Sequence, residues 1–224
     1  MIRDTISLLR KDVLLEVRGR ESVPAMGLLA ITTLVVLHFA LGKESLDGSL
    51  AAGALWVSIL FSATLGIGRL FVAEAEEGGM DAVLLTPVDR TAILCSKVIT
   101  LFLFLVGVQV VVVPAFAILL LGPALSPALS GLIGILLLAD FAIATVGALV
   151  GAIAAQSRLR DLLTPLLALP LLIPPLIAAA SATGKLFAIG GPDAIPGRWP
   201  LIIALYALIF GLLGMALYDN VLDD

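Results

Sequence analysis

The sequence predicts an all-α integral membrane protein with six transmembrane helices, because it is very apolar and carries few charges. Of its 224 residues, 61% are hydrophobic and 13% are charged, against roughly 25% charged residues in an ordinary soluble domain. A soluble chain of this size could not bury so much apolar surface. The composition excludes a soluble enzyme, a disordered chain and a nucleic-acid-binding protein. The net charge of -4 indicates no polyanionic partner.

Residues 1–21 are predicted to form an amphipathic helix that lies in the cytoplasmic membrane interface. Apolar residues recur at spacings of three and four, and basic residues occupy the other positions. Charges of both signs argue against a secretory leader. The helix serves either as an anchor alone or as an anchor that also moves during function. Its apolar stripe consists of Ile2, Ile6, Leu9, Val13 and Val17.

Six apolar stretches are each long enough to cross a bilayer, which takes about 20 residues. The third and fourth share an uncharged run that Gly122-Pro123 and Ser126-Pro127 divide. The fifth contains four prolines, which predict a kinked or broken helix. Residues 184–200 are rich in glycine and proline but apolar, so we expect short half-inserted helices on the outer face. The spans cover residues 22–42, 46–68, 92–121, 128–155, 162–183 and 199–218 of a single domain, 1–224.

The basic residues orient these spans. Ten lysines and arginines fall on the side of the N-terminus and of the loops after the second and fourth spans, and three fall on the other side. The positive-inside rule therefore predicts that both termini are cytoplasmic.

The loop between the second and third spans predicts a protein contact. Gly78-Gly79 interrupts the helix that leaves the membrane, and Thr86-Pro87 ends a short apolar helix after it. Residues 73–90 thus form a cytoplasmic segment that contains a short helix with apolar side chains and no bilayer to cover them. Either a partner protein covers this helix or it folds back onto the bundle, and the exposed patch favours a partner.

Three polar residues are candidates for an intramembrane site. Asp140 costs about 2.5–3.5 kcal/mol at the centre of a span, so it either faces a functional cavity or is a protonated carboxyl bonded to neighbouring backbone. Gln109 is expected to hydrogen-bond between helices. His38 lies near the outer end of the first span, where an interfacial role is favoured over ligation of haem iron. Gly147 and Gly151 form a small-xxx-small motif that serves internal packing or a homodimer contact.

The sequence contains no catalytic motif that we recognise. It has no phosphate-binding loop pattern, no HExxH, no CxxC and no G-x-S-x-G. With one cysteine, Cys95, and one histidine, it offers no evident metal site. We therefore expect a non-catalytic membrane subunit without a firmly bound cofactor.

Three segments resemble the CcmB family, also called haem exporter protein B, the membrane subunit of the cytochrome c maturation ABC transporter. They are Arg10–Glu21, Leu55–Phe61 and, above all, Arg69–Lys97. The last carries the family's cytoplasmic pattern, which ends in an arginine followed by a lysine. The pattern falls on Phe71, Glu74, Glu76, Gly78, Met80, Leu84, Leu85, Pro87, Arg90 and Lys97.

The resemblance implies an ABC-2-type permease in the bacterial inner membrane. Two copies would combine with two separate ATPase subunits, and the short helix within residues 73–90 would be the coupling helix. The complex would work with a haem-handling membrane protein and a haem chaperone, and would either export haem or release the loaded chaperone, so that haem is at most a cargo. The ATPase contact set would be Phe71, Glu74, Glu76, Gly78, Leu84, Leu85, Pro87 and Arg90.

Three other functions stay open from the residues alone. A permease of the same architecture could carry a lipid or a glycan. An ion-coupled secondary transporter could use Asp140 and would work without ATP. A structural scaffold would hold haem-handling proteins together without conformational work.

Overall fold

The computed structural model describes residues 2–19, 21–42, 45–71, 90–155, 157 and 159–221, and seven α-helices account for most of them. Within these residues β pairing is limited to an isolated bridge between Leu46 and Leu121. The helices are α1 (Ile2–Gly19), α2 (Ser22–Leu41), α3 (Gly48–Arg69), α6 (Arg90–Leu119), α7 (Leu125–Ala155), α8 (Arg160–Leu186) and α9 (Arg198–Val221).

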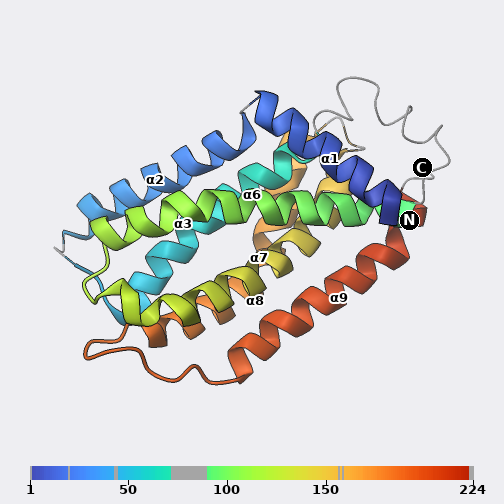
Figure 1. Ribbon diagram of the computed structural model, residues 1–224. Helices are drawn as coiled ribbons and strands as arrows, with labels where there is room; N and C mark the ends of the chain where they lie inside the picture. The colour runs from blue at the N-terminus through green and yellow to red at the C-terminus, as the bar shows by residue number, and fades with distance from the viewer. Residues whose placement is uncertain are drawn as a thin grey trace.

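Helices α2, α3, α6, α7, α8 and α9 are long and apolar enough to cross a membrane. Their ends agree with the six predicted spans to within three residues, which confirms the predicted all-α membrane fold. The first turn of α1 and the last turn of α9 lie at the same end of the bundle (Figure 1), which we call the terminal end. The opposite end, which holds the connections α2–α3, α6–α7 and α8–α9, is the loop end.

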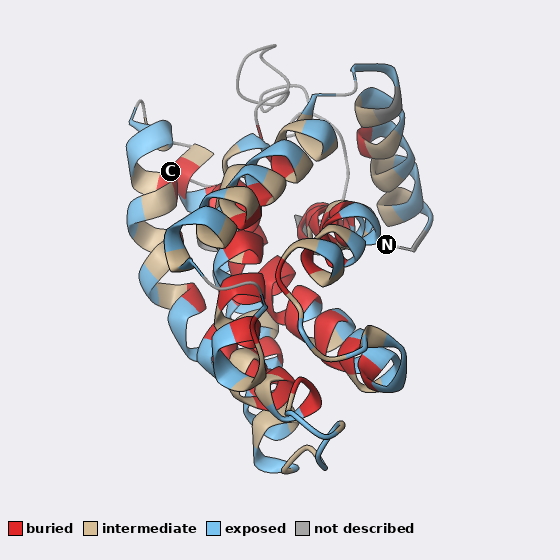
Figure 2. Cartoon of the chain, turned by 90° about the vertical axis from the view of Figure 1, so that its left-hand side faces the viewer, coloured by how far each residue is buried: buried red, intermediate tan, exposed pale blue. Residues whose placement is uncertain are grey.

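The core lies along α7, which contacts α6, α8, α9 and α3. In the most apolar stretch of α7, 72% of the residues are buried, against 17% in the corresponding stretches of α2 and α9. Helix α7 is therefore central, and α2 and α9 are peripheral. Buried residues gather where the helices face one another, and exposed apolar residues cover the outward faces (Figure 2). An apolar outer surface is what lipid requires of a spanning bundle.

The small-xxx-small motif of α7 serves internal packing. A side chain at Gly147 would place its Cβ 2.6 Å from Leu101 Cδ2 and 2.7 Å from Ile67 Cγ1, and one at Gly151 would meet the ring of Phe71 at 3.0 Å. The two glycines therefore let α3 and α6 approach α7 closely. Of the two readings of the motif, this arrangement favours packing within the chain.

The four prolines of α8 do not break it. The helix runs without interruption from Arg160 to Leu186, so of the two expectations, a kinked or a broken helix, the broken one is wrong. Each proline lacks an N–H and leaves the carbonyl four residues earlier without its helical donor. Pro175 does this to Leu171, whose oxygen instead accepts a 2.6 Å hydrogen bond from the hydroxyl of Tyr206 on α9.

The half-inserted helices expected at the loop end are also wrong. Helix α8 continues to Leu186 and α9 begins at Arg198, and the residues between them are irregular. Gly190 and Gly191 have φ values of 98° and 124°, a region that ends a right-handed helix and favours glycine. This connection is held instead by backbone hydrogen bonds, such as that from Asp193 N to Lys185 O at 2.9 Å.

The break between α6 and α7 falls where Gly122-Pro123 predicted it. The backbone N–H of Gly122 donates to Leu46 O at 2.8 Å, and Leu46 N donates to Leu120 O at 2.6 Å. A Cβ at Gly122 would lie 2.9 Å from Ser45 Oγ, so a larger residue there would have to displace the Ser45 side chain from between the two connections.

Candidate functional site

The predicted coupling segment lies largely outside the described residues. Of the proposed ATPase contact set, Glu74, Glu76, Gly78, Leu84, Leu85 and Pro87 fall between residues 72 and 89, and the structure does not test their role. The two flanking positions are described. Phe71 is buried at the end of α3, and Arg90 is the first residue of α6. Both stand at the terminal end, so the segment joins two neighbouring spans there.

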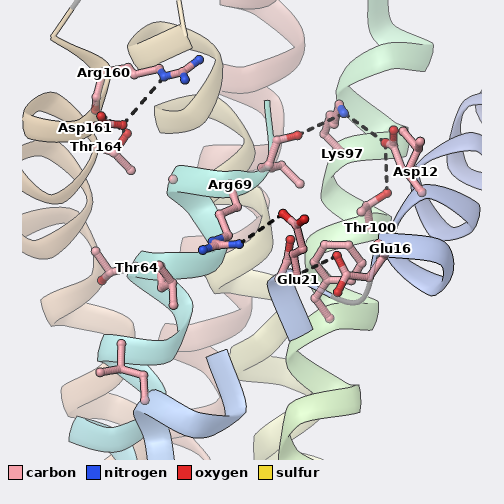
Figure 3. Close-up of a pocket in the computed structure, with 18 of the residues that line it drawn as sticks. Asp12, Glu16, Glu21, Thr64, Arg69, Lys97, Thr100, Arg160, Asp161 and Thr164 are labelled. Atoms are coloured by element: carbon pink, nitrogen blue, oxygen red, sulfur yellow. Dashed lines mark hydrogen bonds and ion pairs between the residues drawn. The ribbon is translucent and has the colours of Figure 1, made fainter. Parts of the chain in front are cut away.

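A cavity of about 990 Å³ lies beside these two helix ends. Five helices line it: α1, α2, α3, α6 and α8. Charged side chains crowd one part, where Arg69 reaches Glu21 at 4.0 Å and Arg160 reaches Asp161 at 3.7 Å (Figure 3). Small polar residues and apolar residues line the remainder, the apolar ones including Leu15, Leu29, Phe61, Leu65, Phe104 and Pro165.

A buried ion pair forms one wall of this cavity. Lys97 on α6 places its Nζ 3.1 Å from Asp12 Oδ2 on α1, and both side chains are less than one-tenth exposed. The same Nζ donates to Leu70 O at 3.1 Å and lies 5.2 Å from the centroid of the Phe71 ring. Thr100 Oγ1 donates to the same carboxylate oxygen at 3.4 Å (Figure 3). One ammonium group thus joins α1, α6 and the end of α3.

Glu16 of α1 also has a defined role in this wall. Its two carboxylate oxygens accept hydrogen bonds from the backbone N–H groups of Ser22 and Val23 at 3.2 and 2.8 Å. These N–H groups belong to the first turn of α2. Backbone N–H groups in the first turn of a helix have no acceptor within the helix, and the helix N-terminus favours a negative charge. The carboxylate therefore fixes the angle between α1 and α2.

Sequence reasoning did not find this cluster. Lys97 entered only as the lysine that follows the family pattern, and Asp12 was one charge among many in an amphipathic helix. The available signal was the position of Asp12, four residues after Leu8 and four before Glu16 on one face of α1. Reading that face as the one that contacts the bundle would have required knowing which partner it meets.

The two intramembrane polar residues meet each other. Gln109 on α6 donates from Nε2 to Asp140 Oδ1 on α7 at 2.7 Å. Asp140 is fully buried, and its Oδ2 has no hydrogen-bond partner among the described residues. The expected helix-to-helix hydrogen bond of Gln109 is thus present, and Asp140 bonds to a side chain rather than to backbone. Neither residue lines the large cavity at the terminal end.

His38 lies one turn before the end of α2, at the loop end. Its ring packs edge-on against Phe39, with centroids 5.2 Å apart, and its Nδ1 is buried without a hydrogen-bond partner among the described residues. The structure brings neither Asp140 nor Gln109 to this position. The interfacial role favoured for His38 stays a prediction, and ligation of haem iron stays its alternative.

These features define a polytopic α-helical membrane protein with an additional helix tied to its terminal end by a buried ion pair. The family model described as CcmB protein matches residues 3–218 of the chain. The chain belongs to the CcmB family, as its sequence predicted.

Curated relatives agree with this assignment along most of the chain. Heme exporter protein B of Rhodobacter capsulatus is 32% identical over 177 residues, which are 78% of this chain and 79% of the relative. The protein of that name from Paracoccus denitrificans is 32% identical over 182 residues, 80% and 82% of the two chains. That of Pseudomonas aeruginosa is 31% identical over 179 residues, 80% and 79%.

Proposed function

We propose that this protein is the membrane permease subunit of a haem export system, driven by ATP hydrolysis on a separate subunit. The match to the CcmB family over residues 3–218 carries the proposal, together with relatives named heme exporter protein B. The output is either export of haem or release of a haem-loaded chaperone for cytochrome c assembly. The chain itself is a non-catalytic subunit.

The geometry at the terminal end supports coupling through the segment 72–89. The segment leaves α3 at Phe71, whose ring packs against Gly151 of α7, and it enters α6 at Arg90. Helices α3 and α6 both contact α7 and α2. A partner that pulls on the segment therefore acts on two core helices at once, and packed helices transmit such displacements as rigid bodies.

We propose that the protein lies in a bacterial inner membrane and that its terminal end faces the cytoplasm. Arg69, Lys97 and Arg160 lie at this end, and α1 adds further basic residues. Lys185 and Arg198 lie at the loop end. The positive-inside rule supports this orientation, which also brings the segment to the side where ATP is available.

A homodimer with two ATPase subunits is the assembly that the family membership suggests. Peripheral helix α2 has a markedly apolar outer face, on which Leu28, Val36 and Phe39 are each more than half exposed. A second copy or lipid can cover this face. Native mass spectrometry of the extracted complex would give the number of copies directly.

The proposal is tested by purifying the tagged protein from membranes and identifying what accompanies it. We expect a nucleotide-hydrolysing subunit and haem-handling proteins. Leu84→Asp should uncouple ATP hydrolysis from haem-dependent cytochrome c assembly while membrane insertion stays normal, because it places a charge where the proposed contact needs an apolar side chain. Leu159→Asp is the matched control, since Leu159 is 63% exposed in the connection between α7 and α8 at the same end. Unchanged cytochrome c assembly in Leu84→Asp would contradict the contact.

A further inference from the structure

We propose that Lys97 is a positioning residue that makes helix α1 move together with the ends of α3 and α6. The inference rests on the proposed function, since those two helix ends are where the segment 72–89 joins the bundle. It concerns a contact that lies wholly within the described residues.

The first argument is how α1 is attached. Asp12 is the single buried side chain among those described in α1, whereas Ile6, Leu14 and Leu15 are 58%, 43% and 49% exposed. Leu8 packs partly buried against the core and Leu15 lines the cavity, so apolar contacts are present, but the most deeply buried of the described side chains of α1 is a charged one. Apart from the chain connection to α2, α1 packs mainly against α6.

The second argument is the cost of such a contact. Taking a lysine and a carboxylate out of water is expensive, and an apolar pair of similar size often stabilises a structure as well or better. A helix that served only as an anchor would need no buried charge here. Buried ion pairs are best attested where they specify one arrangement of elements over others. The pair therefore indicates that the position of α1 is specified.

The third argument is what else Lys97 holds. Its Nζ donates to Leu70 O, the carbonyl of the residue after α3, and lies over the Phe71 ring. Carbonyls at a helix C-terminus lack helical donors and attract a positive charge. Lys97 itself lies about two turns into α6. The ammonium group thus links Asp12 to both helices that the segment 72–89 connects.

These contacts lead to a specific consequence for coupling. A displacement of the helix ends would carry α1 with it through Lys97, and would change the cavity that α1 shares with α3 and α8. Without the ion pair the ATPase would still move α3 and α6, but α1 would follow less closely, because only its connection to α2, the Glu16 contact with the first turn of α2 and its apolar packing would remain. Lys97 then affects the amount of haem-bearing cytochrome c formed per ATP hydrolysed, and not the assembly of the complex.

The experiment uses the complete complex with its ATPase, in cells that depend on it for cytochrome c assembly. Lys97→Met keeps the length of the side chain and removes its charge. We expect the yield of haem-bearing cytochrome c per ATP hydrolysed to fall about 2- to 30-fold, the range found for residues that couple distant sites. Lys97→Arg should recover most of the loss. Asp12→Asn should resemble Lys97→Met, and the double variant should be no worse than either.

Lys11→Met is the matched control, because Lys11 contacts the same carboxylate at 3.4 Å but its side chain is 42% exposed. Lys11→Met should leave the yield of haem-bearing cytochrome c per ATP hydrolysed unchanged. A purely structural role for Lys97 would lower the amount of complex and leave the output per ATP unchanged, which would overturn the inference. Equal effects of Lys11→Met and Lys97→Met would also overturn it.

A second measurement does not need the ATPase and separates this inference from the proposed function. Spin labels at Ser7→Cys and Leu159→Cys, in a Cys95→Ala background, report the distance between α1 and the α7–α8 connection. We expect Lys97→Met to broaden that distance distribution and Lys11→Met to leave it narrow. A distance distribution that Lys97→Met does not broaden rejects the proposed positioning role of Lys97, even if the ATPase is found. Absence of any ATPase from the wild-type preparation, with broadening present, rejects the proposed function alone.

Discussion

The hydroxyl of Tyr206 on α9 donates a 2.6 Å hydrogen bond to the carbonyl oxygen of Leu171 on α8. This oxygen is the acceptor that Pro175 leaves without its helical N–H. In a membrane, water cannot take the place of the missing donor, so a neighbouring helix must supply one. The relationship explains how a span with four prolines stays helical at this point.

Tyr206→Phe should therefore destabilise the protein by about 1 kcal/mol, within the range measured for hydrogen bonds between membrane helices. The phenylalanine keeps the ring, which stacks on Phe210 with centroids 4.7 Å apart, so the change isolates the hydroxyl. The free energy of unfolding in a denaturing detergent titration gives the value. In a Pro175→Ala background the helix supplies its own N–H to Leu171, and the same substitution should cost much less. Equal costs in the two backgrounds would refute the assigned role.

This bond also shows where sequence reasoning on the fold ends. The spans followed from hydrophobicity and the division after α6 from Gly122-Pro123, because lipid imposes length and composition on a helix directly. The prolines of α8 did not reveal whether the helix is broken or continuous. Its continuity near Pro175 depends on a hydroxyl supplied by another helix, and nothing local to residues 160–186 reveals that donor.

The candidate site was predictable to a similar degree. Gln109 and Asp140 were each recognised as unusual inside a span, but their pairing depends on the rotation of α6 against α7, which composition does not give. The cluster of Asp12 and Lys97 was missed because a basic residue in a predicted span end and an acid in an amphipathic helix are each ordinary. Their burial arises only when α1 docks on α6.

Gly147→Ala should destabilise the protein by about 1–3 kcal/mol, the usual cost of forcing an extra methyl group into a packed core. Its Cβ would lie within 2.7 Å of side-chain atoms of Leu101 and Ile67, so these side chains, or the helices that carry them, must shift. Gly134→Ala on the same helix is the control, because a Cβ there meets nothing within 4 Å. It should be neutral or stabilise the helix by up to about 1 kcal/mol. Unfolding in a denaturing detergent gives the free energy of unfolding of each variant. Similar changes for the two variants would show that the close approach of the helices at Gly147 does not determine stability.

The orientation of the chain is checked by labelling single cysteines in a Cys95→Ala background. Ile189 is 83% exposed at the loop end, and Leu159 is 63% exposed at the terminal end. In intact spheroplasts we expect a membrane-impermeant maleimide to label Ile189→Cys and to spare Leu159→Cys until the membrane is permeabilised. The reverse pattern would place the termini outside and would remove the cytoplasmic ATPase contact.

Asp140→Asn should leave haem-dependent cytochrome c assembly near the wild-type level, because the asparagine oxygen still accepts the 2.7 Å hydrogen bond from Gln109. An ATP-driven permease needs no proton or ion on Asp140, whereas an ion-coupled transporter would lose its coupling site. Gln109→Leu is the structural control. It leaves a fully buried carboxyl without the partner that the structure shows, and should cost about 1–3 kcal/mol of stability. Loss of cytochrome c assembly in Asp140→Asn, at normal protein level and with ATPase still bound, would favour the ion-coupled alternative over the function proposed above.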